Sequence, residues 1–178
     1  MKKIMSLFAV LLSVCLVAAP GCNQPNTGWD FEQVAPIIRS STTIFTQFAF
    51  NNPRVAPHKE EICTATGKVV EFLNTYDDPD ASFDNMKAAV LEVITQLPPE
   101  TLSGEAKQIT LAVTEFVLDS GWLFVRDNYL DLINKDESKV VLLLAKSVAD
   151  GIQAACGTSV TTMSTAPELN TYFDKYTP

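Results

Sequence analysis

Apolar residues recur at steps of three, four and seven positions along most of the chain between Asp30 and Cys156. Because an α-helix turns once every ~3.6 residues, this spacing places the apolar side chains on one face of a helix. Clusters of Pro, Asn, Asp and Ser interrupt the pattern at intervals. The sequence therefore predicts an all-α fold, a bundle of four to five antiparallel helices joined by short loops. The interruptions fall at 51–53, 77–81, 98–103 and 134–138.

The breaks divide the predicted helical domain, 30–157, into five segments. In the first, Pro36 is expected to kink the opening turns or to shift the start of the helix. The fourth has apolar residues on two sides, so it should be central and largely buried, with a break or bend at 119–121. The run from Val140 to Leu144 is compatible with a buried strand, but its Ala-rich continuation favours a helix. The expected helices cover about 30–51, 57–76, 82–97, 104–133 and 139–155.

Three residues have the chemistry that marks helix ends. Ser82 and Ser103 precede helical segments, where a serine hydroxyl can accept a hydrogen bond from a free backbone N–H. Gly157 follows the last segment, and glycine is common where helices stop. Residues 158–178 are polar with scattered aromatics, and we expect either a loose tail or a strap across the bundle.

The first 22 residues have the organisation of an export signal. Lys2 and Lys3 precede an apolar run over 4–19, which is shorter than the ~20 residues of a membrane-spanning helix. The segment ends in Pro20-Gly21-Cys22. This ending resembles that of bacterial lipoprotein precursors, in which a cysteine after a small residue becomes the lipidated first residue. The resemblance implies a signal peptide over 1–21, palmitate or a related acyl chain on Cys22, and attachment to a membrane of the cell envelope.

Two alternatives to lipidation remain open. Cleavage after Ala19 would release a secreted protein in which Cys22 is not lipidated, and an uncleaved segment would itself be the anchor. Residues 23–28 are polar and include Pro25 and Gly28, so the segment 22–29 should form a flexible tether. Asn23, rather than Asp, follows the cysteine, and this slightly favours the outer membrane if the host is Gram-negative.

The cysteines point to one disulfide. Cys15 is removed with the signal peptide and Cys22 would be modified, which leaves Cys63 and Cys156 in an exported protein. A disulfide between them would close a loop of about 90 residues and add up to ~4–5 kcal/mol of stability. The alternative is two buried free thiols that behave as small apolar groups.

Charge argues against several partners. Lys2 and Lys3 are the only charged residues before Cys22, and the whole chain has 13 basic and 21 acidic side chains. The segment from Cys22 onward therefore keeps 11 basic and 21 acidic side chains, a net charge of −10. Such a body repels phosphates, so we expect no nucleic-acid partner and no electrostatic attraction to anionic lipid. A need for solubility is enough to explain the acidity.

No motif for catalysis, metal binding or a cofactor stands out. His58 is the only histidine, and the acids at 77–84 do not have the ligand spacing of a calcium loop. Trp122, Phe124 and Tyr129 form a possible interface, since aromatics often anchor binding surfaces, although at helical spacing they are more often core. We expect a membrane-anchored envelope lipoprotein, not an enzyme, acting as a protein-binding or structural module with an envelope protein as partner. The alternatives are a carrier of a small apolar ligand or lipid within the bundle, and an unrecognised enzyme.

Overall fold

The computed structural model describes residues 31–79, 81–129, 133 and 136–157. Within these ranges the protein contains five α-helices, one short 3-10 helix and no strand, which confirms the all-α prediction. The helices are α2 (Phe31–Phe50), α3 (Lys59–Thr75), α4 (Phe83–Gln96), α5 (Gly104–Asn128) and α7 (Glu137–Cys156), with η1 (Ala56–His58) in front of α3.

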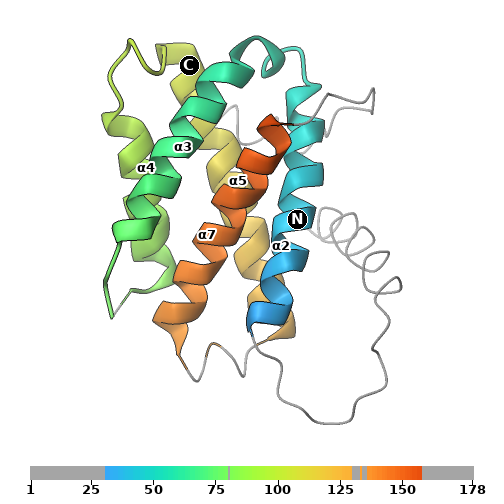
Figure 1. Ribbon diagram of the computed structural model, residues 1–178, viewed down its shortest axis with the longest axis vertical. Helices are drawn as coiled ribbons and strands as arrows, with labels where there is room; N and C mark the ends of the chain where they lie inside the picture. Colours follow the sequence, from blue (N-terminus) through green and yellow to red (C-terminus); the bar gives the residue numbers. More distant parts are fainter. Residues whose placement is uncertain (1–30, 80, 130–132, 134–135, 158–178) are drawn as a thin grey trace.

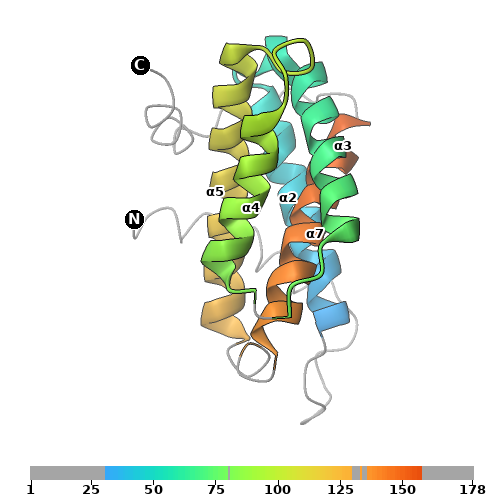
Figure 2. The same ribbon diagram turned by 90° about the vertical axis from the view of Figure 1, so that its left-hand side faces the viewer.

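The described helices alternate in direction along the chain, so that each runs antiparallel to the one before it (Figure 1). The first and last of them, α2 and α7, lie side by side and run in the same direction (Figure 1). Figure 2 shows α4 packed between α5 and α3. The predicted antiparallel arrangement therefore holds for consecutive helices. The first and last described helices, α2 and α7, form one parallel pair.

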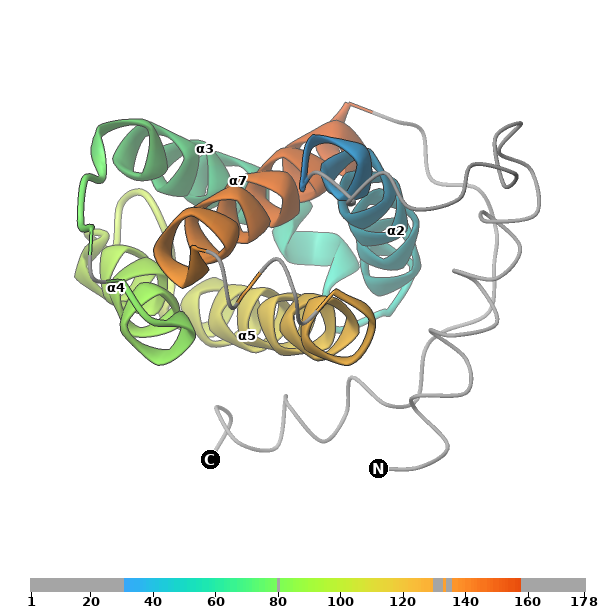
Figure 3. The ribbon, with the colours of Figure 1, turned by 90° about the horizontal axis from the view of Figure 1, so that it is seen from below.

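Helix α7 occupies the middle of the arrangement when the bundle is viewed along its axis (Figure 3). It contacts each of the other four α-helices, and its most extensive contact is with α2. Helix α5 is largely buried, as its two apolar faces predict. It is also the helix among the described residues that is long and apolar enough to cross a membrane, but 61% of its most apolar stretch is buried inside the protein.

Two predicted helix ends are confirmed in detail. The hydroxyl of Ser82 accepts a hydrogen bond from the N–H of Asn85 (3.3 Å) at the start of α4. Helix α7 ends at Cys156, directly before Gly157. The φ of this glycine is −79°, so the helix stops without using the left-handed conformation that glycine permits. At its other end α7 is capped by Asp136, whose carboxylate accepts from the N–H of Lys139 (3.1 Å).

The structure contradicts a start of the first helix shifted to Pro36 and a break of the fourth at 119–121. Helix α2 starts at Phe31 and continues through Pro36, which lies in its second turn with its ring exposed. Helix α5 runs unbroken through 119–121 as far as Asn128. A Cβ atom on Gly121 would lie 3.0 Å from Cδ1 of Leu144, so the glycine lets α7 approach α5 closely instead of breaking the helix.

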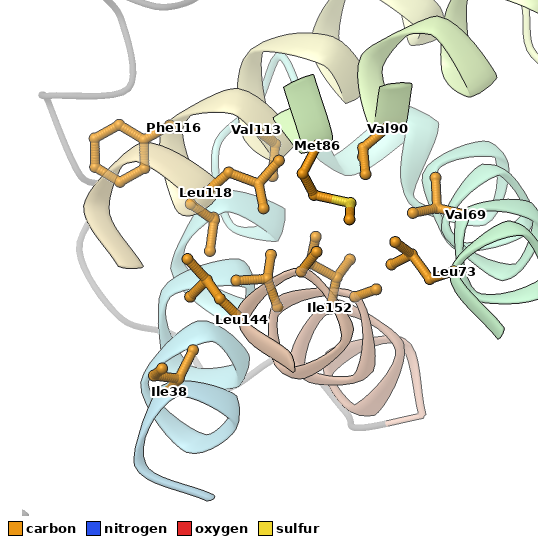
Figure 4. Close-up of a cluster of buried hydrophobic side chains, with 14 of the residues drawn as sticks. Ile38, Val69, Leu73, Met86, Val90, Val113, Phe116, Leu118, Leu144 and Ile152 are labelled. Carbon is orange, nitrogen blue, oxygen red and sulfur yellow. The ribbon is translucent and has the colours of Figure 1, made fainter. Parts of the chain in front are cut away.

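All five α-helices contribute to one hydrophobic core (Figure 4). Ile38 of α2 and Leu144 and Ile152 of α7 point into the same cluster as side chains of the other three helices. Burial of such side chains contributes roughly 1.5–3 kcal/mol each, which makes the cluster the main source of stability. The other labelled members are Val69 and Leu73 of α3, Met86 and Val90 of α4, and Val113, Phe116 and Leu118 of α5.

Candidate functional site

Cys63 and Cys156 form a disulfide that joins α3 to the last residue of α7. The two Cα atoms lie 5.9 Å apart, within the usual range for a disulfide, and the bridge spans 93 positions of sequence. The side-chain amide of Gln153 donates to the carbonyl oxygen of Cys63 (2.7 Å), which adds a polar tie beside the covalent one. The predicted disulfide is confirmed.

Two of the three aromatic residues of the predicted interface, Trp122 and Phe124, lie in α5, and Tyr129 directly follows its last residue. Trp122 is half-buried and stacks on Phe83 of α4, with the ring centroids 4.8 Å apart and the planes at 4°. Phe124, two residues further on, lies on the opposite side of the helix and packs edge-on against Tyr129 at 5.6 Å. Tyr129 is only 8% exposed, and its burial raises the pKa of the phenol above the usual 10.0. The structure therefore does not bring the three rings into one surface.

A charged cluster lies next to the Phe83–Trp122 stack. The ammonium group of Lys87 donates to the Asp119 carboxylate (2.9 Å) and lies 3.7 Å from a carboxylate oxygen of Glu115. It is also 5.5 Å from the centre of the Phe83 ring, a cation–π distance. Because Glu115 is 6% exposed, removal of the lysine would leave a buried carboxylate without this partner. The cluster ties α4 to α5.

A second polar cluster connects the starts of α3 and α5. The backbone N–H of Ser103 donates to the Glu61 carboxylate (2.6 Å), and this bond lowers the pKa of the Glu61 carboxyl below its usual 4.5. The imidazole of His58 lies between Glu61 (3.4 Å) and Glu105 (3.8 Å). Glu61 therefore contacts both His58 and the start of α5, which holds the first turns of α3 and α5 together.

An interior cavity lies between α3, α4, α5 and α7. Its volume is about 10 Å³, roughly the space of one water molecule. Thr66 and Thr114 supply its polar groups, and the other lining residues are apolar. Small-molecule pockets are typically ~300–1,000 Å³, so a lipid or a comparable apolar ligand does not fit here.

Within the described ranges no three His, Cys, Asp or Glu side chains are grouped so that they could hold a metal ion. In the acidic turn before α4, the phenol of Tyr76 donates to the carboxylate of Asp78 (3.2 Å). Burial is the main reason that the pKa of Tyr76 is raised, and Asp78 adds to the effect. This turn therefore forms a local tyrosine–carboxylate contact.

Several predictions concern residues outside the described ranges. They are the signal peptide over 1–21, lipidation of Cys22, the tether over 22–29, and the tail or strap over 158–178.

The two charged clusters were missed at the sequence level, although part of their signal is visible there. Glu115 and Asp119 are four residues apart, which places both carboxylates on one face of α5. Lys87 lies 32 positions from Asp119 in sequence, and only the packing of α4 on α5 brings it to them. The same holds for Glu61 and Ser103, which are 42 positions apart.

Comparison with known proteins gave no relative: no family model, no curated protein and no solved structure matches this chain.

Proposed function

We propose that this chain is a cell-envelope lipoprotein. An acylated Cys22 anchors it to a membrane, and its helical domain acts as a non-enzymatic module that binds an envelope protein or has a structural role. The observation that carries the proposal is the disulfide between Cys63 and Cys156. Disulfides persist in oxidising compartments outside the cytoplasm, which is where the export signal over 1–21 would send the chain.

The polar clusters support a module without catalysis. Lys87 is bound by two carboxylates, and the Glu61 carboxylate is bound by the N–H of Ser103. Each group therefore holds one helix to another in the part of the chain that the structure describes. A binding or structural role requires only this kind of stable scaffold, with side chains available on its surface.

The carrier alternative receives no support from the cavity between α3, α4, α5 and α7. Its volume of about 10 Å³ would have to increase more than tenfold before a lipid chain could enter. Such an opening would expose the core around Leu118 and Ile152. We therefore favour binding at the surface of the domain over binding inside it.

The anchor is tested by the intact mass of the mature protein purified from a host that acylates lipoproteins. We expect a chain that begins at Cys22 and carries acyl groups, and we expect Cys22→Ala to lose them. Cys15→Ala is the matched control, because Cys15 lies in the signal peptide and its replacement should leave the mature mass unchanged. An unmodified chain that begins at Pro20 would overturn the proposal of a lipid anchor.

The module role has its own test. The acylated protein is crosslinked in intact cells, and we expect one envelope protein to be captured reproducibly at stoichiometric amounts. Capture should fall when the same domain is released into solution as Cys22→Ala. A protein that stays monomeric and captures no partner under these conditions would contradict a protein-binding role.

A further inference from the structure

Helix α2 has a second apolar stripe beside the one that enters the core. Ile37, Ile44 and Phe48 each precede by one position a residue that packs in the core or against it, so they lie about 100° around the helix from it. All three are half-buried. Within the described part of the chain they belong neither to the buried core nor to the partly buried side chains that pack against it.

Helix α5 extends this apolar surface. Phe45 of α2 stacks on Phe116 of α5, with the ring centroids 4.5 Å apart. The two helices run in opposite directions (Figure 1). Leu123 lies seven residues after Phe116, two turns further along nearly the same side of α5. Leu123 is 39% exposed. We define the α2 face as Ile37, Ile44, Phe48 and Leu123.

Three of the four residues of the α2 face, Ile37, Ile44 and Phe48, lie in a stretch of the chain that lacks acidic residues. Residues 33–59 contain three basic side chains (Arg39, Arg54 and Lys59) and no Asp or Glu, although the segment from Cys22 onward has a net charge of −10. Near Leu123, the guanidinium of Arg126 lies 3.2 Å from the carboxylate of Asp127 and neutralises it. A negatively charged membrane surface would repel the acidic remainder of the domain, but it would repel α2 only weakly.

The position of α2 in the chain brings the same surface close to the anchor. Only eight residues separate Cys22 from Phe31, the first residue of α2. Fully extended, they span at most ~30 Å, about the length of a 20-residue helix. Figure 3 shows α2 at the edge of the bundle, packed on α7, so it is the first element that an anchored domain can bring to the bilayer.

We infer that the α2 face rests on the lipid bilayer to which Cys22 is anchored. The domain therefore lies along the membrane, with α2 between the bilayer and the rest of the bundle. This inference rests on the lipid anchor of the proposed function. The apolar area of four side chains gives weak binding by itself. A short linker between an anchor and a domain raises the effective concentration of the bilayer to roughly the millimolar range, which favours a weak contact.

The test places an environment-sensitive nitrobenzoxadiazole probe on the acylated full-length mature protein. In Ile44→Cys the new thiol is the single reactive one, because Cys63 and Cys156 are bonded to each other and Cys22 is acylated. Ala88→Cys is the matched control, since Ala88 is an exposed, small residue of α4, outside the α2 face. In vesicles of equal parts phosphatidylethanolamine and phosphatidylglycerol, we expect a blue shift and higher intensity at position 44 and no change at position 88.

A second variant keeps the test independent of the probe. Phe48→Glu adds a charge at a half-buried position, and circular dichroism shows whether the fold is kept. If it is kept, the Ile44→Cys probe should lose its blue shift in vesicles when Phe48→Glu is added. Ala88→Glu, which adds the same charge on α4, should leave the blue shift unchanged.

Four results would overturn the inference. If the emission of the probe at position 44 does not change when vesicles are added, α2 does not contact lipid. A blue shift without vesicles that grows with protein concentration would assign the α2 face to a second copy of the chain. A shift without vesicles that is independent of concentration and is lost on removal of 158–178 would assign it to the chain's own C-terminal segment. An unacylated Cys22 would overturn both this inference and the lipid anchor, whereas the other three results leave the anchor intact.

Discussion

At the scale of the residue, the threonine hydroxyls inside the bundle differ in whether they find an acceptor. Thr66 and Thr110 donate to the carbonyl oxygen one turn earlier, at 2.8 Å and 2.7 Å. Thr43 donates across the α2–α7 contact to the carbonyl oxygen of Gly151 (3.0 Å). Thr46 is fully buried, and its hydroxyl has no hydrogen-bond partner in the described part of the chain. An unsatisfied buried hydroxyl costs free energy of folding.

Thr46→Val should therefore stabilise the protein. Valine has nearly the same shape and removes the unpartnered hydroxyl, so we expect the free energy of unfolding to rise by about 1 kcal/mol. Urea unfolding followed by circular dichroism measures the change. Thr110→Val is the control, because Thr110 is equally buried but hydrogen-bonded, and it should bring no gain. A loss of stability in Thr46→Val would mean that the Thr46 hydroxyl has an acceptor.

Helix caps show how far sequence reasoning reaches at this scale. The cap at Ser82 was predictable because the accepting hydroxyl of Ser82 and the donating N–H of Asn85 are only three residues apart, at the start of the same helix. The Ser103 side chain makes no capping hydrogen bond, and the Glu61 carboxylate on α3 binds the Ser103 N–H instead. The hydrogen bond from Ser103 to Glu61 depends on the packing of α3 against α5, which cannot be read from the local sequence.

At the scale of the element, small residues allow α2 and α7 to pack closely. A Cβ atom on Gly151 would lie 2.6 Å from Cβ of Thr42 and 2.7 Å from the carbonyl oxygen of Arg39. Both are too close for a real contact, and the second involves rigid backbone. Gly151 is thus required because its neighbours on α2 leave no room for a Cβ atom.

Gly151→Ala should force α2 away from α7. We expect a loss of about 1–3 kcal/mol in the free energy of unfolding, typical of overpacking, measured by urea or thermal unfolding. Gly67→Ala is the matched control, since its Cβ would meet only the Gln153 amide at 3.5 Å, an ordinary contact. It should stabilise α3 by about 0.5–1 kcal/mol through helix propensity. Equal effects of the two substitutions would contradict the close α2–α7 contact.

The contact between Glu61 and the start of α5 should make stability depend on pH in the acid range. Hydrogen bonding from Ser103 lowers the pKa of Glu61 in the folded protein, and neighbouring His58 adds to this against the opposing effect of burial. A lowered pKa means that the contribution to stability is fully present above pH ~4.5 and is lost as the pH falls through the folded pKa.

Glu61→Gln should remove that contribution at pH 7 and make the fall in stability below pH ~4.5 shallower. Urea unfolding at a series of pH values measures both effects. Glu71→Gln is the control, because Glu71 is 68% exposed and contacts only Lys68 of its own helix among the described ion pairs. It should leave the acid limb of the curve unchanged, and a parallel shift in both variants would argue against a special role of Glu61.

The positions of the helices could be predicted from the sequence to within a few residues, because the period of the apolar residues is a local property. The predicted break at Gly121 failed because the same glycine serves a contact with Leu144, which is 23 positions away. A glycine in a helical segment can serve a turn or a close approach, and the residue alone does not distinguish the two.

At the scale of the whole molecule, the disulfide between Cys63 and Cys156 closes a covalent loop that contains most of α3, all of α4 and α5, and α7. Replacing both cysteines, as Cys63→Ala with Cys156→Ala, should lower the free energy of unfolding by about 4 kcal/mol, because the unfolded chain gains the freedom of a loop of 93 positions. Urea unfolding of the oxidised protein against the double variant measures the loss. A reduced wild-type sample should behave like the double variant, and stability that is unaffected by reduction would contradict the bridge.

The overall class of fold was accessible from the sequence, but the pairing of its helices was not. Two apolar sides predicted that α5 would be buried, and this is so, yet the helix in the middle is α7. The contact between the first and last described helices depends on Gly151 and Thr42, which are far apart in the chain. The aromatic residues Trp122 and Phe124 are two positions apart in the sequence, but they lie on opposite sides of α5 and contact different rings.

The bridge between α3 and α7 also determines how the protein responds to mechanical tension. If the chain is pulled between Cys22 and its C-terminus, the force crosses from Cys63 to Cys156 through the covalent bond and bypasses α4, α5 and most of α3 and α7. Helix α2 and the short segment that follows it are the described part of the load path in front of the bridge. Pulling would therefore unwind α2 first and extend the chain by no more than ~110 Å over residues 31–62, while the rest of the bundle carries no load.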